Sequence, residues 1–371
     1  MSPAPIRSQE VTLAKRILMA GNKAAGEGAI QAGCMAYYGY PITPQNELTG
    51  YMAANMPRHG RVFLQAESEL AAVNMVLGSA AAGVRAMTSS SSPGISLKQE
   101  GISYLAALQL PAVIVNMQRG GPGLGNIGPG QADYWQATRG GGHGDYRCIV
   151  LAPHSVHEMF STMTLAFDLA DKYRMVCMVL GDGRLGQMME PVEVPDNVHP
   201  SPPPKPWALN GCSGRPAQRL CSLLLDENKL EALNARLQQC YREVQKNEVR
   251  WEEVGVDDAE IVMVAYGTSA RVCKEAAREA RKAGLKVGLV RPITLWPFPA
   301  KPIREAAARG ARFLVVEMSA GQMIDDVRLS LERPAEVHFM GRTGGNVPLA
   351  PDVLEYLRQM ASGKAAARKD Y

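Results

Sequence analysis

Four short segments in the first third of the chain carry side chains that could bind a ligand and do chemistry. Residues 40–45 read YPITPQ, and residues 65–69 place two glutamates directly after an apolar run. A serine-rich turn ends in Pro-Gly at residues 89–94, and Arg119 ends a further apolar run. Together they supply carboxylates, hydroxyls, a guanidinium and a backbone whose freedom is restricted by prolines.

Glu69 is the candidate acid–base residue. It follows Ser68, a suitable N-cap for a helix of small residues, and comes just after an apolar strand. A carboxyl group buried in such surroundings holds its proton more tightly and could share it with a ring nitrogen of a ligand. The alternative is a helix-N-terminal carboxylate that interacts only with the helix dipole, a common role for glutamate in a first turn.

Thr43 and Arg119 are candidates for binding a ligand, and Arg119 in particular for binding a carboxylate. Thr43 stands between two prolines that hold its hydroxyl in place, although it could instead cap a helix that begins near Gln45. Arg119 ends a strand and opens a glycine-rich loop, residues 120–126, where α/β proteins bind ligands. Its guanidinium fork can bind both oxygens of a carboxylate, or it could form a structural ion pair.

His143 lies in the glycine-rich stretch 140–144. An imidazole on such a loop could assist proton transfer near a bound cofactor. It could equally be an exposed loop residue, and the sequence favours neither role.

In this order and spacing the four segments resemble the pyrimidine-side half of a thiamine diphosphate site. They are most similar to the alpha subunit of the 2-oxoacid:ferredoxin oxidoreductases, and within these to the branched-chain (3-methyl-2-oxobutanoate, or 2-ketoisovalerate) type. The resemblance covers essentially the whole chain. It implies that Glu69, rather than Glu67, bonds the pyrimidine N1′ and favours the imino tautomer, and that Thr43 bonds the substrate carboxylate. The cofactor-binding residues that it implies are Tyr40, Pro41, Ile42, Glu69, Ser92 and Gly94.

One pattern imitates the metal–diphosphate motif of thiamine enzymes. Residues 181–183 read GDG, and Asn210 follows at a suitable distance. Seven prolines between residues 191 and 206 exclude the helix that would bring Asp182 and Asn210 to one magnesium ion. We therefore expect no metal ligand in this chain and a diphosphate half contributed by another polypeptide.

The resemblance implies the oxidation of a 2-oxoacid with coenzyme A and ferredoxin to acyl-CoA, carbon dioxide and reduced ferredoxin. It also implies a beta subunit that binds the diphosphate and Mg²⁺, together with gamma and ferredoxin-like delta subunits. [4Fe-4S] clusters are expected in these partners. Two alternatives are a noncatalytic scaffold subunit, which the presence of Glu69, Thr43 and Arg119 disfavours, and a self-contained enzyme such as transketolase, which the missing diphosphate motif disfavours.

The loop after Arg119 bears on the substrate. A 2-oxoglutarate pocket needs a second cation for the distal carboxylate, and no Lys, Arg or His occurs after Arg119 before Arg139. Leu124 and Ile127 would instead suit branched aliphatic groups. We therefore expect branched-chain 2-oxoacids to be preferred over 2-oxoglutarate. Arg139, Lys98 or a residue of a partner could still reach the pocket.

Alternating strands and helices must position these residues. Such alternation indicates a parallel sheet covered on both faces. The predicted strands of the first unit are residues 35–40, 61–65, 85–88, 112–117, 148–151 and 175–180. A second unit has predicted strands at 261–265, 286–290, 312–317 and 337–340, and helices at 270–283 and 325–331.

The expected fold class is α/β. Residues 1–195 would form a pyrimidine-type thiamine diphosphate-binding domain on a parallel sheet, and residues 257–371 a domain that resembles the transketolase C-terminal type. Between them, residues 196–256 read as a proline-rich linker and a connecting helix over residues 226–252.

The composition excludes several other classes. The 371 residues carry a formal net charge of only +4, so neither nucleic acid nor an acidic membrane is an expected partner. No apolar stretch suits a transmembrane helix, and residues 1–10 lack the apolar core of a signal peptide. The seven cysteines are dispersed without a CxxC pair, which favours the cytoplasm and argues against an iron–sulfur cluster in this chain. The basic run 364–369 is expected to be a solvated end.

Overall fold

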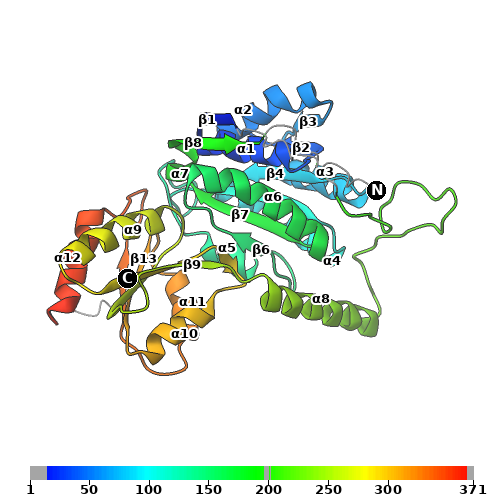
Figure 1. Ribbon diagram of the computed structural model, residues 1–371. Helices are drawn as coiled ribbons and strands as arrows, with labels where there is room; N and C mark the ends of the chain where they lie inside the picture. Colours follow the sequence, from blue (N-terminus) through cyan, green and yellow to red (C-terminus); the bar gives the residue numbers. More distant parts are fainter. Residues whose placement is uncertain (1–14, 196–199, 201, 366–371) are drawn as a thin grey trace, which may run out of the picture.

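A seven-stranded sheet carries the segments that the sequence singles out (Figure 1). The computed structural model describes residues 15–195, 200 and 202–365; the predictions for residues 1–10 and for most of the run 364–369 lie outside this range. The strand order is β12–β6–β7–β5–β4–β2–β3, and all neighbours are parallel except β12 and β6. In chain order, the first six strands of this sheet are β2 (Ala36–Gly39), β3 (Val62–Gln65), β4 (Ala86–Ser90), β5 (Ala112–Gln118), β6 (Ile149–Leu151) and β7 (Val176–Asp182).

Helices cover both faces of this sheet, so its central strands are apolar throughout rather than alternating. Val113 and Val115 of β5 pack in one core with α1 and α6, whereas Ile114 packs in another core with α3 and α4. The helices of this unit are α1 (Gly21–Gln31), α2 (Asn46–Asn55), the 3₁₀ turn η1 (Pro57–His59), α3 (Glu69–Ala81), α4 (Pro93–Ala107), α5 (Tyr134–Arg139), α6 (Val156–Tyr173) and α7 (Gly183–Gln187).

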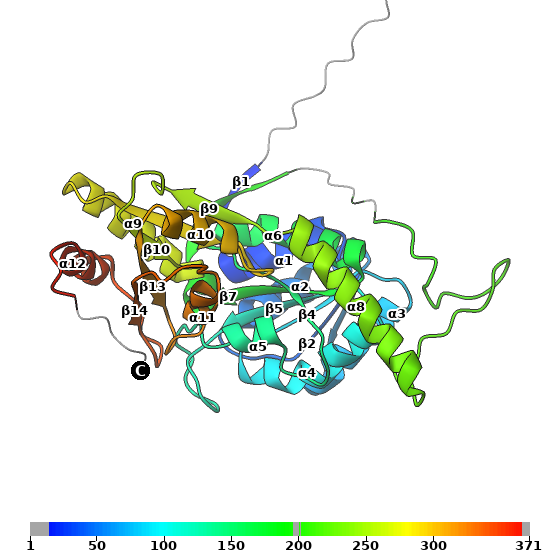
Figure 2. The ribbon, with the colours of Figure 1, turned by 90° about the horizontal axis from the view of Figure 1, so that it is seen from below.

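A five-stranded sheet follows, in the order β14–β13–β10–β11–β9. Its strands are β9 (Trp251–Val254), β10 (Ile261–Val264), β11 (Val287–Pro292), β13 (Arg312–Glu317) and β14 (Val337–Gly341). Its helices are α9 (Gly267–Lys282), α10 (Ala300–Ala308), α11 (Met323–Leu329) and α12 (Ala350–Ala361). Figure 2 shows this unit beside the larger sheet rather than stacked on it.

The two units share structure. Strand β12 (Thr294–Trp296) follows β11 directly but pairs with β6 of the larger sheet. One apolar core runs through both units and includes Tyr134 and Tyr266, whose rings lie 5.9 Å apart. The domain boundaries predicted at residues 195 and 257 stay a proposal: β9, which precedes residue 257, pairs with the smaller sheet, and β12, which follows it, pairs with the larger one.

The connecting helix α8 (Glu227–Asn247) is amphipathic and lies against the larger unit (Figure 2). Its prediction to residue 252 is wrong at the C-terminal end. The helix stops at Asn247 because the following residues have tertiary partners: Glu248 accepts hydrogen bonds from Lys172 and Tyr173, and β9 pairs antiparallel with β11.

An antiparallel pair that the sequence did not predict joins β1 (Lys15–Ala20) to β8 (Met189–Val194). None of the helices in the described ranges is long and apolar enough to cross a lipid bilayer.

Candidate active site

The four predicted segments meet at one edge of the larger sheet. They follow the carboxyl ends of β2, β3, β4 and β5, which are parallel neighbours in the order β5–β4–β2–β3. In α/β sheets this edge is where ligands bind. The register of the strands thus brings residues from four separate parts of the sequence into one site.

Glu69 is the first residue of α3 and is only 6% exposed. The predicted N-cap Ser68 is confirmed, since its Oγ accepts a hydrogen bond from the backbone N–H of Ala71 at 3.1 Å. Gly94 lies against the carboxylate: a Cβ on Gly94 would come within 2.7 Å of Glu69 Oε1 and 2.1 Å of Ser90 Oγ. Glu67, by contrast, is exposed.

Several polar atoms at this edge lack partners. Among the hydrogen bonds of the described residues, none ends on a carboxylate oxygen of Glu69. Within the same residues, the buried hydroxyls of Ser90 and Ser91 and the Nε of Arg119 also have no hydrogen-bond partner. A buried polar group without a partner costs about 1–3 kcal/mol. A ligand that completes these bonds would remove that cost, whereas a structural role at the helix N-terminus leaves the cost unexplained.

The serine turn is locked onto β5. Ser92 adopts φ 20° and ψ −80°, and its Oγ donates to Asp133 Oδ2 at 2.6 Å while accepting from the backbone N–H of Arg119 at 3.0 Å. The side chain of Asn116 accepts from the N–H of Ser92 and donates to Asp133. Burial raises the pKa of Asp133, and the hydrogen bonds from Ser92 and Asn116 oppose this rise. Neither Asn116 nor Asp133 was predicted from the sequence. Asn116 is a polar residue within the apolar strand β5, and this pattern could have indicated a functional role.

The segment 40–45 is tied to the same turn. Gln45 is fully buried, and its Oε1 accepts hydrogen bonds from Ser89 and Thr49. Tyr40 and Pro41 are exposed and Ile42 is half-buried, so a ligand or another polypeptide can contact this part of the segment.

Arg119 and Thr43 are adjacent and are joined by a hydrogen bond. The guanidinium donates from Nη1 to the carbonyl oxygen of Thr43 and from Nη2 to that of Leu124, both at 2.9 Å. The Thr43 hydroxyl accepts from the side chain of Asn46, at the start of α2, and does not cap the helix backbone. Arg119 therefore holds two loops together, and its buried Nε has no hydrogen-bond partner among the described residues.

The structure does not bring Leu124 and Ile127 into a buried pocket. Their side chains are 80% and 65% exposed. Asn126 ties the loop to the second unit by donating to the carbonyl of Gly344, and it accepts a hydrogen bond from the N–H of Gly128. These two residues could form an aliphatic pocket only if another polypeptide covered them.

His143 is not brought to Glu69 either. It is exposed, and its carbonyl accepts a hydrogen bond from Ser103. Ser103 follows Gly94 by nine residues on α4, which at about 1.5 Å per residue is about 14 Å along the helix. His143 lines a separate cavity of about 500 Å³ beside α8.

Asp182 is engaged in capping. Its Oδ1 accepts from the N–H groups of Arg184 and Leu185 and from the hydroxyl of Thr268, at 2.9–3.0 Å. Burial raises the pKa of Asp182, and these hydrogen bonds oppose the rise. Asn210 instead accepts a hydrogen bond from Arg215. Within the described part of the chain no three His, Cys, Asp or Glu side chains are grouped as a metal site.

A cavity of about 680 Å³ lies between the two units, directly beside the Arg119 loop. Its lining includes Ser92 and Arg119, which follow β4 and β5 at the carboxyl edge of the larger sheet. The polar and larger side chains that line it are Ser92, Ser96, Arg119, Asp133, Met318, Ser319, Gln322 and Thr343.

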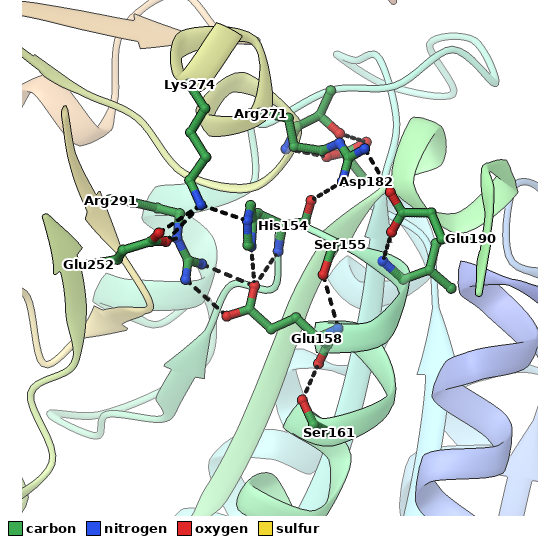
Figure 3. Close-up of polar contacts among 12 residues, drawn as sticks. His154, Ser155, Glu158, Ser161, Asp182, Glu190, Glu252, Arg271, Lys274 and Arg291 are labelled. Atoms are coloured by element: carbon green, nitrogen blue, oxygen red, sulfur yellow. Dashed lines mark hydrogen bonds and ion pairs between the residues drawn. The ribbon is translucent and has the colours of Figure 1, made fainter. Parts of the chain in front are cut away.

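A second polar region joins the units (Figure 3). We call it the ionic ring; it consists of His154, Glu158, Glu252, Lys274 and Arg291. Arg291 binds Glu158 with both terminal nitrogens at 3.0–3.1 Å and Glu252 through Nε at 2.7 Å. Lys274 binds both oxygens of Glu252 at 2.8–2.9 Å and lies 3.0 Å from His154 Nε2.

His154 closes the ring through a hydrogen bond between its Nδ1 and Glu158. Burial would raise the pKa of Glu158, but the hydrogen bond with His154 and the charge of Arg291 lower it to about 2. Every charged group of the ring thus has an opposite charge or a hydrogen bond, and the ring links α6 to β9, α9 and β11.

Comparisons with known proteins identify the family of the chain. The family profile described as "Pyruvate flavodoxin/ferredoxin oxidoreductase, thiamine diP-bdg" matches residues 27–222, and "Pyruvate:ferredoxin oxidoreductase core domain II" matches residues 259–353. The ketoisovalerate oxidoreductase subunit VorB of Methanothermobacter thermautotrophicus is 53% identical over 93% of this chain and 97% of its own length. The 2-oxoglutarate synthase subunit KorA of the same organism is 37% identical, over 92% and 97%.

Solved structures show the same fold. A 2-oxoglutarate:ferredoxin oxidoreductase from Magnetococcus marinus, solved with 2-oxoglutarate, coenzyme A and succinyl-CoA bound, matches with a TM-score of 0.85 and 26% identity. The match covers 93% of this chain, which spans 65% of that longer chain. A split-gene transketolase matches with a TM-score of 0.58 at 15% identity, and shows the fold alone.

The fold and the site define a thiamine diphosphate-binding α/β protein. The chain belongs to the 2-oxoacid:ferredoxin oxidoreductase family. The family and the fold class predicted from the sequence are both confirmed.

Proposed function

We propose that the chain is the alpha subunit of a thiamine diphosphate-dependent oxidoreductase that converts a branched-chain 2-oxoacid and coenzyme A to acyl-CoA and carbon dioxide while reducing ferredoxin. The observation that carries the proposal is the buried Glu69 carboxylate at the sheet edge, which meets no donor within the described residues. The ketoisovalerate oxidoreductase relative is more similar to the chain than the 2-oxoglutarate synthase relative, at 53% against 37% identity. This order supports the branched-chain substrate.

The residues present fit the pyrimidine ring of the cofactor. Glu69 offers a carboxyl group for a ring nitrogen, Gly94 leaves space where a side chain would clash, and Ser90 and Ser91 have buried hydroxyls without partners. When bound, thiamine diphosphate supplies the nucleophilic thiazolium carbon that adds to the 2-oxo group. Glu69 holds or shares the proton at the ring nitrogen, and its burial excludes the water that would compete for it.

Arg119 and Thr43 would orient the substrate carboxylate. Arg119 faces the inter-unit cavity, and its unpartnered Nε supports the assignment. For Leu124 and Ile127 we propose contact with the aliphatic end of the substrate only once a partner covers them, because both are exposed in this chain. His143, remote from Glu69, is not proposed as a proton-transfer residue.

A beta subunit would supply the diphosphate and Mg²⁺ side, and gamma and ferredoxin-like delta subunits the [4Fe-4S] clusters. Asp182, whose GDG sequence only imitates the metal–diphosphate motif, already accepts three hydrogen bonds on one oxygen. Apolar side chains are exposed around Glu69, as expected for a surface that docks on a partner. They are Val62, Leu64, Leu70 and Leu97.

All seven cysteines are free thiols, which supports the proposed cytoplasmic compartment.

The test is coexpression with the subunits encoded by neighbouring reading frames. We expect the purified complex to reduce ferredoxin only with thiamine diphosphate, coenzyme A and a 2-oxoacid, and kcat/KM to be highest for 3-methyl-2-oxobutanoate. Activity independent of thiamine diphosphate would overturn the proposal. A tenfold preference for 2-oxoglutarate would overturn the substrate while leaving the reaction class intact.

A further inference from the structure

Lys98 is a lysine inside the protein, on the buried stripe of α4. Its side chain is fully buried, and its Nζ donates a hydrogen bond to the backbone carbonyl oxygen of Glu69 at 3.1 Å. It lies one turn after Gly94 and just before Gly101. A Cβ on Gly101 would come within 2.5 Å of a methyl group of Val73. The two glycines let α3 and α4 approach closely, and Lys98 is enclosed between them.

The position is costly for an ammonium group. A buried charge is expensive unless it is paired, and a methionine would fill a similar space without that cost. Burial lowers the pKa of Lys98 to about 8, with the charge of Glu69 acting in the opposite direction. Buried titratable groups of this kind concentrate at functional sites.

From the sequence, Lys98 was a residue that could reach the substrate pocket, but its contacts lie elsewhere. Its ammonium is bonded to the first residue of α3, and it is not among the residues that line the cavity beside Arg119. Its contacts connect it instead to the carboxylate assigned to the cofactor.

We propose that Lys98 is a positioning residue for Glu69. It holds the start of α3 against the start of α4, which keeps the Glu69 carboxylate beside Gly94, and it places a positive charge next to that carboxylate. The inference rests on the proposed function, because it concerns the carboxylate that would bond the cofactor.

The experiment compares Lys98→Met and Lys98→Gln with a matched control, Ile102→Met, in the complex with its partner subunits. Ile102 is buried on the same helix and makes no polar side-chain contact, so its variant reports packing alone. Lys98→Gln keeps a donor but no charge. The measurements are the melting temperature, the dissociation constant of thiamine diphosphate from quenching of tryptophan fluorescence, and the pH profile of kcat/KM.

We expect Lys98→Met to melt no lower than Ile102→Met, to bind thiamine diphosphate at least tenfold more weakly, and to lose kcat with little change in KM for coenzyme A. A limb of the wild-type pH profile near the Lys98 pKa of about 8 should be absent in both Lys98 variants, because neither carries the ionisable ammonium group. If Lys98→Met matches Ile102→Met in cofactor affinity, kcat and pH limb, the inference is wrong. Should Lys98→Met fail to fold, Lys98→Gln decides by the same criteria. A Glu69→Gln variant that keeps normal cofactor binding and turnover would instead overturn the proposed function itself.

Discussion

The sheet edge around Glu69 and the ionic ring around His154 are both built from buried or half-buried polar side chains, but these side chains differ in how many of them have a hydrogen-bond or ion-pair partner. In the ring, each charged group meets an opposite charge or a hydrogen bond within this chain. At the sheet edge, the buried hydroxyls of Ser90 and Ser91 and the Nε of Arg119 have no partner among the described residues. The contrast separates a region that is complete by itself from one that a ligand and another subunit would complete.

The largest expected effect is at the incomplete region. Glu69→Gln should lower kcat at least a hundredfold, about 2.7 kcal/mol, while the complex still assembles, because the fold does not need the charge but the cofactor does. Steady-state assays and size-exclusion chromatography measure the two outcomes. Glu67→Gln is the matched control and should be near wild type, since Glu67 is exposed. If Glu69→Gln keeps more than about a tenth of the rate, Glu67 becomes the candidate.

Gly94→Ala should be the next most damaging change. Its Cβ would lie 2.1 Å from Ser90 Oγ and 2.7 Å from Glu69 Oε1, so the carboxylate must move. We expect thiamine diphosphate to bind at least tenfold more weakly in a fluorescence titration. Gly78→Ala on α3 is the control, because a Cβ there meets nothing within 4 Å; it should stabilise the protein by about 0.5–1 kcal/mol. Normal cofactor affinity in Gly94→Ala would argue against the close approach.

Breaking the complete region should affect stability rather than chemistry. The side chain of Arg291 is 4% exposed and bonds two half-buried carboxylates, so Arg291→Met removes one partner from each of them. The expected loss is about 1.5–2.5 kcal/mol in the free energy of unfolding, measured with denaturant. Lys282→Ala removes an exposed pair with Glu279 and should cost no more than about 0.5 kcal/mol. Equal effects of the two variants would show that the ring does not hold the units together.

The ring should also respond to acid. The pKa of Glu158 is lowered from 4.5 to about 2 in the folded protein, so its stabilising effect is complete above the unfolded value and is lost as the pH falls toward 2. We expect the free energy of unfolding to fall more steeply between these pH values in the wild type than in Glu158→Gln. Parallel curves for the two proteins would contradict the assignment.

The smallest effect is expected at His143. It is exposed and bonded through its backbone to Ser103, remote from Glu69. His143→Ala should therefore change kcat by less than about twofold, a fraction of a kcal/mol. A tenfold loss in the assembled complex would restore the proton-transfer role.

Local patterns determined much of this structure. The strand Arg312–Glu317 and the N-cap at Ser68 occur as the sequence predicted. The first four strands of the larger sheet were predicted to within a few residues. Apolar runs, helix caps and prolines determine the backbone conformation of residues close to them in the sequence. A motif that directly follows a strand lies at the carboxyl edge of a parallel sheet.

Contacts between distant residues set the remaining features. The helix α8 ends early because Glu248 bonds α6 and β9 joins the second sheet, and β12 leaves its own unit to pair with β6. The sequence pattern placed Lys98 on α4, but only the close packing of α3 on α4 buried its ammonium beside Glu69. The ionic ring likewise joins residues more than a hundred positions apart, such as Glu158 and Arg291. No local pattern contains such pairs, because their energies depend on burial and distance in the folded chain.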